Sequence, residues 1–452
     1  MGDLYVNATT GMDAPGRGTT LSDPLRTITF AVNEAVTRFG AALSALNVAA
    51  GTYNEALGEE FPILLPQNIS LIGEGSDRTF LRIDHDVGAA SATCMQGGRE
   101  ITGIALIGYP LTPGACRWVY GIALQQDGTY IHDIAIGGAA AGDFGFGDAI
   151  ANFGVAARIE RVQVSRCATA FNGSTDGTDA LCTIRDSRFD VAAVVINNFV
   201  GEISDNHFDS ADTAIWVRSY RGVSDVSILR NHFQACTQAI FIEADPLDSA
   251  MPYRVTVSHN TIVDAIIGVG IHARVDATVS NNTFELSMDR SIAVRVGSYA
   301  RDTYTISPVL KDNIMAKTAP HPTGLIEPLV EISGGHSPVL EGNSLGIATV
   351  DGFPLIAIPI MAIYSATPDL GGGVGRRRSA GRNRFVTGGI RIFSSETSGP
   401  RAISARNNYW RNVPPSIIHV GRPLVWGEVD IDPRGGPVTI DVGGAMRLPA
   451  ID

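Results

Sequence analysis

Hydrophobic and polar residues alternate along short segments of this chain, and turn residues separate the segments. The alternation has a period of two and is rich in β-branched residues, which predicts strands with one buried face. None of these segments shows the period of a helix. The clearest are TAIWV (213–217), QAIFI (238–242), IGVGI (267–271), SIAVRV (291–296), PLVEI (328–332) and GGIRI (388–392).

An asparagine motif recurs between these segments. ISDNHF (203–208), ILRNHF (228–233) and VSHNTI (257–262) share an apolar residue, two further residues, Asn, one residue and a second apolar residue. Consecutive Asn lie 22 to 40 residues apart, so a fixed core carries insertions of variable length. This pattern predicts a solenoid, whose insertions become loops. The series runs through Ser187, Asn206, Asn231, Asn260, Asn282, Asn313, Asn343, Asn383 and Asn408.

Equivalent residues of a solenoid form ladders, because successive coils stack about 4.8 Å apart. Stacked Asn side chains can hydrogen-bond one another and the turn backbone, and Asn tolerates the left-handed conformation that a tight bend needs. The flanking apolar residues point inward and form the core. The predicted fold class is therefore all-β, a single parallel β-helix of about a dozen coils with an Asn ladder.

One amphipathic helix is predicted, over SDPLRTITFAVNEAVTRFG (22–40), with Ser22 or Asp23 as N-cap and Pro24 in the first turn. It would cap the first coil, since open strand edges promote aggregation. We expect one domain over residues 1–452: an N-terminal cap and first coil in 1–60, coils in 61–400, and a last coil and C-terminal cap in 401–452. The apolar face of the helix contains Ile28, Ala31, Val32, Ala35, Val36 and Phe39.

Several segments resemble those of a known superfamily. YVNATTG, SDPLRTITFAV, AAGTYNE and ISLIGEG, within residues 5–75, are similar to the N-terminal part of bacterial pectate-lyase-like right-handed parallel β-helix proteins. The Asn-x-Phe coils and NNYW near residue 410 resemble the repeats and last coil of the same superfamily. The resemblance implies a right-handed helix. It also implies a choice among polysaccharide lyases, glycoside hydrolases, epimerases, phage tailspikes and surface proteins, because fold does not select an activity.

Charge and hydropathy exclude some partners. The formal net charge is −12, whereas a protein that follows phosphates is normally basic, so no nucleic-acid partner is expected. No run of about 18 apolar residues predicts a membrane-spanning helix. MGDLYVNATT lacks the pattern of a signal peptide. Either the chain is not exported by that route or a leader was removed; the expected location is extracellular or at the cell surface.

The cysteines and the acidic loops are candidates for a disulfide and for a metal site. Five cysteines include Cys94 and Cys116, which either pair in an oxidising compartment or, like the others, pack as buried thiols. No metal site is predicted with certainty. Loops such as DGTD (176–179) are calcium candidates, although no ligand set is complete.

The outward side chains of the alternating strands carry the candidate chemistry. With Ile215, Val217 and their equivalents inward, one outward row contains Trp216, Phe241, Gly270 and Ala293. A second outward row contains Arg218, Glu243, His272, Arg295 and Glu331. Gln125, Asn152 and Asn197 are predicted to continue this surface upstream.

Aromatic faces stack on sugar rings, and Arg, Asn and Glu bind hydroxyls or uronate carboxylates. In a lyase, His272 or an arginine is the candidate base, and Arg218 and Arg295 flank His272. A hydrolase needs two carboxylates about 5–9.5 Å apart, which Glu243 and Glu331, about three coils apart, do not satisfy; Asp209 and Asp212 lie closer to Glu243. Alternating charges on adjacent strands also stabilise a solvated sheet face without any ligand.

The sequence is therefore compatible with three functions. The chain binds or processes a polysaccharide, with a lyase-type enzyme on an acidic glycan as the finer hypothesis and Trp216, Phe241, Asn197 and Glu331 as substrate contacts. Alternatively, it is a non-enzymatic surface or assembly solenoid. The third function is a phage-type spike that forms a trimer. The sequence does not determine the oligomeric state.

Overall fold

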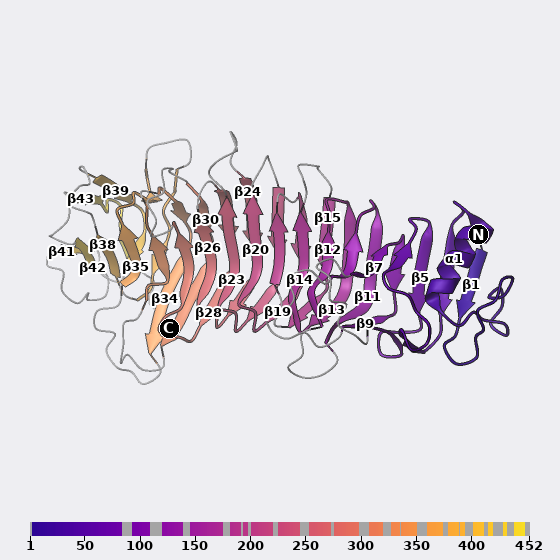
Figure 1. Ribbon diagram of the computed structural model, residues 1–452. Coiled ribbons are helices and arrows are strands. Elements are labelled where there is room, and N and C mark those ends of the chain that lie inside the picture. Colours follow the sequence, from indigo (N-terminus) through magenta and orange to yellow (C-terminus); the bar gives the residue numbers. More distant parts are fainter. Residues whose placement is uncertain are drawn as a thin grey trace. The chain divides into compact units, whose positions relative to one another are not determined.

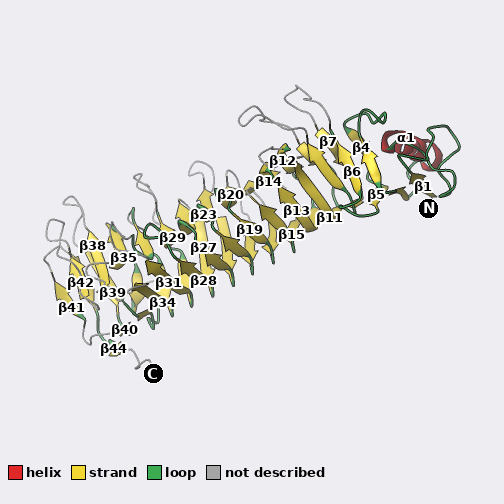
Figure 2. Cartoon of the chain, turned by 90° about the horizontal axis from the view of Figure 1, so that it is seen from below, coloured by secondary structure: helices red, strands yellow, loops and turns green. Residues whose placement is uncertain are grey.

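The computed structural model forms two compact units, Met1–Asp209 and Ser210–Asp452. Each is built from coils of parallel strands, as Figures 1 and 2 show. The expectation of one domain over the whole chain stays a prediction. The structure describes residues 2–83, 93–108, 120–138, 145–174, 181–190, 193–197, 200–219, 225–244, 253–272, 275–297, 307–319, 327–334, 336–349, 359–373, 378–387, 389–393, 401–410, 415–418, 428–431 and 438–447.

In the first unit the strands belong to two sheets, A and B, and each described strand pairs in parallel with the equivalent strand of the next coil. Sheet B contains β4 (Ile63–Leu65), β7 (Thr93–Gly97), β10 (Tyr120–Leu124), β12 (Phe146–Asn152), β14 (Cys167–Ser174) and β17 (Ala193–Asn197). Sheet A contains β1 (Gly2–Val6), β2 (Ser44–Val48), β3 (Gly51–Tyr53), β5 (Ile69–Gly73), β6 (Thr79–Arg82), β8 (Glu100–Thr102), β9 (Ala105–Gly108), β11 (Thr129–Gly138), β13 (Ala157–Ser165), β15 (Leu181–Arg185), β16 (Arg188–Asp190), β18 (Val200–Ser204) and β19 (His207–Asp209).

The second unit repeats this arrangement. Its sheet B contains β20 (Thr213–Ser219), β23 (Gln238–Ala244), β26 (Ile267–His272), β29 (Ile292–Val296), β32 (Val330–Ile332), β35 (Pro359–Tyr364), β38 (Gly389–Phe393), β42 (Glu428–Ile431) and β41 (Ser416–Ile418), in that order. Its sheet A contains β21 (Asp225–Leu229), β22 (His232–Gln234), β24 (Tyr253–Ser258), β25 (Thr261–Val263), β27 (Val275–Ser280), β28 (Thr283–Leu286), β30 (Val309–Lys311), β31 (Ile314–Ala319), β33 (Val339–Glu341), β34 (Ser344–Thr349), β36 (Asp369–Gly371), β37 (Arg384–Phe385), β39 (Arg401–Ala405), β40 (Tyr409–Trp410), β43 (Val438–Asp441) and β44 (Met446–Arg447).

The predicted asparagine ladder is present in the second unit, where it joins Asn231 to Asn408. The Oδ1 of each ladder Asn accepts hydrogen bonds from the backbone N–H of the preceding ladder Asn, at 2.8–3.1 Å, and from its side-chain amide, at 2.9–3.1 Å. The left-handed conformation belongs to the residue before the ladder Asn, for example His259 and Asp312, with φ of 58° and 53°. The ladder Asn therefore satisfies buried backbone groups, and its neighbour makes the bend.

The core of each unit consists of the inward apolar residues of the strands. In the first unit Phe189 and Phe208 stack with ring centroids 5.0 Å apart, and in the second unit Phe385 and Trp410 stack at 4.5 Å. All four side chains are at most 1% exposed. Burying one such side chain contributes about 1.5–3 kcal/mol, so the stacked coils supply most of the driving force for folding.

The N-terminal helix, α1 (Ile28–Phe39), packs against β1, β2 and β4 of the first unit. It begins later than predicted, because Thr27 is the N-cap and its Oγ1 accepts from the N–H of Phe30 at 3.2 Å. Asp23 instead forms an ion pair with Arg17. Val36, predicted on the buried face, is 46% exposed.

A distant carboxylate completes the cap of α1. Glu59, 3% exposed, accepts hydrogen bonds from the backbone N–H groups of Ile28 at 2.7 Å and Thr29 at 2.9 Å. These are free N–H groups at the start of a helix, where negative charge is favoured. Spacing within the helix could not reveal this contact, because 31 residues separate Glu59 from Ile28.

Candidate functional site

The candidate surface is the outward face of sheet B in the second unit, formed by β20, β23, β26, β29, β32, β35, β38 and β42. The predicted alternation is correct there. Ile215, Val217 and their equivalents in the following three strands point inward and are 0% exposed. We call the outward side chains of these eight strands the sheet-B strip.

The register of the strands defines two outward rows. Arg295 aligns with Gly270, and Glu331 aligns with Arg295, so both belong to the row of Trp216. The prediction that they continue the row of Arg218 and His272 is wrong, because Arg295 lies between inward Val294 and Val296 as Trp216 lies between Ile215 and Val217. Ala293, predicted in the Trp216 row, is 0% exposed and does not belong to it. The Trp216 row contains Trp216, Phe241, Gly270, Arg295, Glu331, Ala362, Arg391 and Asp430.

Trp216 lies at the centre of a cluster at the start of the strip. The guanidinium carbon of Arg218 lies 4.5 Å from the centroid of the Trp216 ring, and the indole Nε1 donates to Oε2 of Glu243 at 3.2 Å. The Arg218 Nε and the same carboxylate oxygen are 3.8 Å apart. The centroids of Trp216 and Phe241 are 5.9 Å apart, and both side chains are partly exposed. The predicted neighbours are thus brought together, with the charges of Arg218 and Glu243 paired.

Neighbouring side chains cover Gly270 in the Trp216 row. A Cβ on this residue would stand 2.6 Å from the amide nitrogen of Gln238, 3.3 Å from the ring of Phe241 and 3.6 Å from Nε2 of His272. The imidazole of His272 meets Phe241 edge-on, with centroids 4.8 Å apart. An amide, an imidazole and an aromatic ring therefore lie side by side at this point of the strip, and each can contact a sugar.

Two further charged pairs follow in the Trp216 row. Arg295 Nη2 lies 3.4 Å from Oε2 of Glu331, and Arg391 Nε lies 3.5 Å from Oδ2 of Asp430. Glu331 and Asp430 are each 1% exposed, whereas the two arginine side chains are 20% and 22% exposed. Each arginine therefore covers a buried carboxylate and keeps part of its own surface in solvent.

A second aromatic pair, not found from the sequence, lies near the far end of the strip. Tyr364 and Phe393 align on β35 and β38 and stack with centroids 4.7 Å apart and an interplanar angle of 3°. Each follows an inward Ile, at 363 and 392, as Arg218 follows Val217, so the pair belongs to the Arg218 row. The same alternation, continued through PIMAIY and one residue past GGIRI, would have found it.

The upstream candidates lie in the first unit and do not form one row. Asn152 is 2% exposed, and its side chain binds both backbone groups of Val155 at 2.9 Å, so it stabilises a turn. That prediction is wrong. Gln125 is exposed and accepts a hydrogen bond from Gln96. Asn197 ends β17, and its side chain lies outside the described residues.

The three paired carboxylates of the strip, Glu243, Glu331 and Asp430, lie too far from one another to act as a hydrolase pair. Glu243 and Glu331 lie three strands apart, as do Glu331 and Asp430, which is about 14 Å and beyond the reach of paired-carboxylate chemistry. Across the described parts of the chain, no group of three or more His, Cys, Asp and Glu could hold a metal ion. The calcium candidate 176–179 lies outside the described residues. Cys94, Cys167, Cys182 and Cys236 are buried free thiols, while Cys116 is not described.

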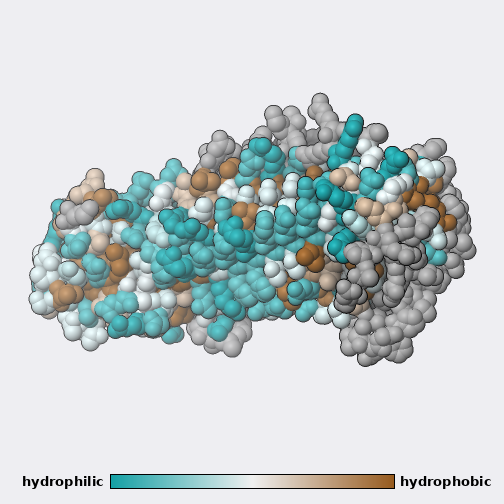
Figure 3. Space-filling view, turned by 180° about the vertical axis from the view of Figure 1, so that it is seen from behind, coloured by the Kyte–Doolittle hydropathy of each residue, from teal (hydrophilic) through white to brown (hydrophobic). Residues whose placement is uncertain are grey.

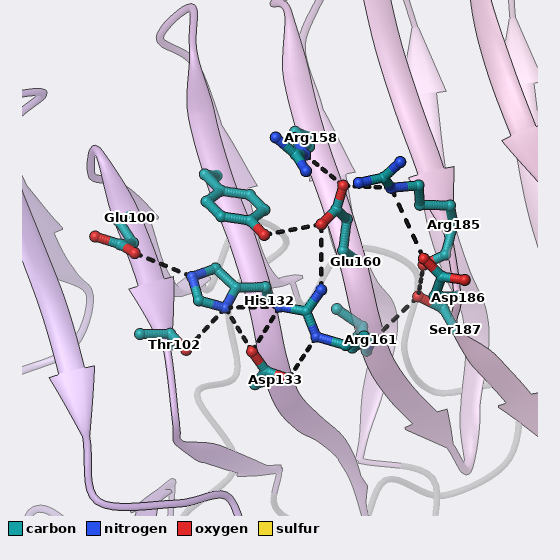
Figure 4. Close-up of polar contacts among 12 residues, drawn as sticks. Glu100, Thr102, His132, Asp133, Arg158, Glu160, Arg161, Arg185, Asp186 and Ser187 are labelled. Atoms are coloured by element: carbon teal, nitrogen blue, oxygen red, sulfur yellow. Dashed lines mark hydrogen bonds and ion pairs between the residues drawn. The ribbon is translucent and has the colours of Figure 1, made fainter.

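A second polar cluster, missed by the sequence analysis, lies on sheet A of the first unit (Figure 4). Glu160, 1% exposed, accepts hydrogen bonds from Arg158, Arg185 and, at 2.8 Å, the hydroxyl of Tyr130. Burial alone would raise the pKa of Glu160, but these three donors outweigh it and hold the pKa at about 2. Arg161 also lies 3.3 Å from its carboxylate.

His132 extends this cluster to the preceding strand. Its Nε2 lies 3.0 Å from Oε1 of Glu100, and its Nδ1 lies 2.6 Å from Oδ2 of Asp133. Hydrogen bonds from Arg161 hold the pKa of Asp133 at about 2, against the opposing effect of partial burial. Opposite charges face each other across neighbouring strands throughout the cluster, which is how a solvated sheet face is stabilised. We therefore assign it a structural role.

The rest of the surface carries no large apolar patch in the view of Figure 3, where hydrophilic side chains dominate and hydrophobic ones are scattered. Exposed hydrophobics such as Leu21, 78% exposed, are ordinary on a protein surface. Phe153, 49% exposed, meets Tyr120 edge-on in the first unit, with centroids 5.6 Å apart. Among the described residues, no helix has the length and apolar character needed to cross a membrane.

Comparisons with known proteins support the fold. Residues 121–295 match the family model described as right handed beta helix region, and residues 9–104 match that described as protein of unknown function (DUF1565). These matches, with the parallel strands, confirm the resemblance to the pectate-lyase-like right-handed parallel β-helix superfamily. A comparison with curated proteins found no match.

Solved structures from several sources align with this chain. One is the A-module of a mannuronan C-5 epimerase from Azotobacter vinelandii, with 13% identity, a TM-score of 0.35 and coverage of 98% of this chain and 100% of that one. Another is an N-terminal fragment of gene product 12 of bacteriophage Phi29, with 13% identity, a TM-score of 0.43 and coverage of 80% and 71%. A third is the catalytic unit of an alpha-1,3-glucanase from Streptomyces thermodiastaticus, with 14% identity, a TM-score of 0.41 and coverage of 77% and 66%. These likenesses concern the fold and assign no activity.

Proposed function

We propose that this right-handed parallel β-helix binds a polysaccharide along the sheet-B strip of its second unit. The observation that carries the proposal is the pair of aromatic contacts at the two ends of the strip. Trp216 and Phe241 lie on its first two strands, and Tyr364 and Phe393 lie on its sixth and seventh. All four rings are outward and partly exposed on a sheet whose remaining outward side chains are small or polar.

The spacing of the strip suits an extended polymer. The two aromatic pairs span seven strands, from β20 to β38, so six inter-strand steps of about 4.8 Å give a distance along the strip of about 29 Å. Aromatic faces bury the C–H surfaces of sugar rings, and the polar groups between them donate and accept hydrogen bonds from hydroxyls. A ligand that touches both aromatic pairs must be an oligomer of several sugar units.

Turnover is a separate question from binding. The finer hypothesis is a lyase on an acidic glycan, with His272 as base. In the structure the imidazole of His272 meets the ring of Phe241 edge-on, and the guanidinium groups of Arg218 and Arg295 each face a carboxylate. Ultraviolet absorbance of unsaturated products tests the lyase hypothesis directly. Loss of that signal in His272→Ala, with binding retained, would support it.

The binding proposal is tested with single substitutions in the full chain. We expect Trp216→Ala and Tyr364→Ala each to weaken binding to the best glycan of a broad panel by at least about tenfold, because buried aromatic anchors dominate such interfaces. The matched control is Phe153→Ala, which removes an exposed aromatic ring in the first unit. Circular dichroism checks that each variant is folded. Equal glycan affinities for all three folded variants would show that the strip is not the binding site.

Ligand length gives an independent check. We expect affinity to rise with oligosaccharide length until both aromatic pairs are occupied, at about seven units if one sugar spans one strand. A plateau at two or three units would show that only one pair binds.

The alternative function is a non-enzymatic surface or assembly solenoid. It predicts no glycan affinity and no effect of Trp216→Ala on any assembly that the chain forms. An extracellular or cell-surface location fits both functions and stays a prediction.

A further inference from the structure

The charges of the sheet-B strip follow a regular arrangement. Arg218, Arg295 and Arg391 lie on β20, β29 and β38, each three strands after the one before. Every one of them faces a carboxylate on the strand that follows, at 3.8, 3.4 and 3.5 Å respectively. The acidic partners are Glu243, Glu331 and Asp430.

This arrangement leaves no excess of positive charge. The described strands of the strip contain three arginines and no lysine, against four carboxylates: the three partners and Glu428. The chain as a whole carries a formal charge of −12. A polyanion aligned with the strip would meet paired guanidinium groups and an overall repulsive field.

A ligand with hydroxyl groups suits such paired arginines. The arginines paired with Glu331 and Asp430 are the exposed members of their pairs. A hydroxyl group can accept a hydrogen bond from a guanidinium N–H without bringing a further negative charge to the pair.

The groups between the charged pairs are also uncharged or apolar. The amide of Gln238 and the ring of Phe241 cover Gly270, and Ala362 separates the last two pairs. Resting on the proposed function, we infer that the strip binds a neutral glycan, one without carboxylate or sulfate groups. This ligand class differs from the acidic glycan expected from the sequence, because every arginine counted as a partner for uronates already has a carboxylate partner.

The test compares the two ligand classes at two ionic strengths. Dissociation constants of the full chain are measured for β-glucan, α-glucan, xylan and mannan, and for polygalacturonate and alginate. At least one neutral glycan is expected to bind with an affinity that changes less than about twofold between about 0.01 M and about 1 M salt. Uronate polymers are expected to bind at least about tenfold more weakly. Preferred, salt-sensitive binding of a uronate polymer would overturn the inference but leave the proposed function standing.

A substitution tests the pairing itself. Glu331→Gln keeps the shape of the side chain and removes the charge opposite Arg295, so this variant is expected to gain at least about threefold in affinity for polygalacturonate or alginate at low salt. Glu285→Gln is the matched control, because it removes the same charge from an exposed position on sheet A. An equal gain in both variants, or in neither, would show that pairing on the strip does not set the ligand class. Absence of binding to either class would contradict the proposed function itself.

Discussion

At the scale of single residues, the side-chain amides of the ladder asparagines stabilise the bend of each coil. Asn282 donates to the carbonyl oxygens of Val257 and Ser280, at 3.0 and 3.1 Å, and to Oδ1 of Asn313 at 3.0 Å. Its own Oδ1 accepts from the backbone and side chain of Asn260, both at 2.9 Å. One side chain thus satisfies groups in three coils, and most of these hydrogen bonds are buried.

We expect Asn282→Ala to lower the free energy of unfolding of the second unit by about 2–4 kcal/mol, because it leaves several buried backbone and amide groups unpaired. Urea denaturation followed by circular dichroism measures the change. Glu285→Ala, an exposed residue of the same coil, should stay within about 0.5 kcal/mol of the wild type. Equal midpoints for the two variants would show that the ladder contributes little.

At the scale of elements, the strands of sheet A in the first unit are joined by the charged cluster of Figure 4. The pKa values of Glu160 and Asp133 are held at about 2, below their ordinary values. A lowered carboxyl pKa means that the folded state prefers the ionised form. The stabilisation is therefore complete above the ordinary pKa and is lost as pH falls toward about 2.

We expect Glu160→Gln to be less stable than the wild type near neutral pH and to lose less stability on acidification, because it has no carboxylate left to protonate. The measurement is the urea midpoint at about pH 7 and about pH 3. The exposed side chain of Glu60 lies outside the cluster, so Glu60→Gln should show the same change in urea midpoint between the two pH values as the wild type. If Glu160→Gln also showed the wild-type change, the cluster would not make the stability of the first unit depend on pH.

The limits of sequence reasoning also lie at this scale. Alternation and the Asn motif were enough to predict parallel coils and the inward positions, since both depend on neighbouring residues. The row assignment was wrong by two residues at Arg295, although the alternation itself places Arg295 between inward Val294 and Val296, as it places Trp216 between Ile215 and Val217. Glu59 and the cluster around Glu160 were missed, because their partners come from other coils.

At the scale of the whole molecule, function rests on side chains gathered from distant segments. Trp216 and Phe393 are 177 residues apart in sequence and share one face of the second unit only because each coil contributes one strand to sheet B. The solenoid places equivalent side chains of successive coils about 4.8 Å apart along one face. Such a regular row suits a polymeric ligand better than a compact one.

The most direct measurement of this account is hydroxyl-radical footprinting of the full chain with and without its best-binding glycan. The account predicts that oxidation of Trp216, Phe241, Tyr364 and Phe393 falls together when the glycan is bound, while Phe153 in the first unit is oxidised as before. Protection of Phe153 with no change at the four strip residues would contradict the central claim and place the ligand elsewhere.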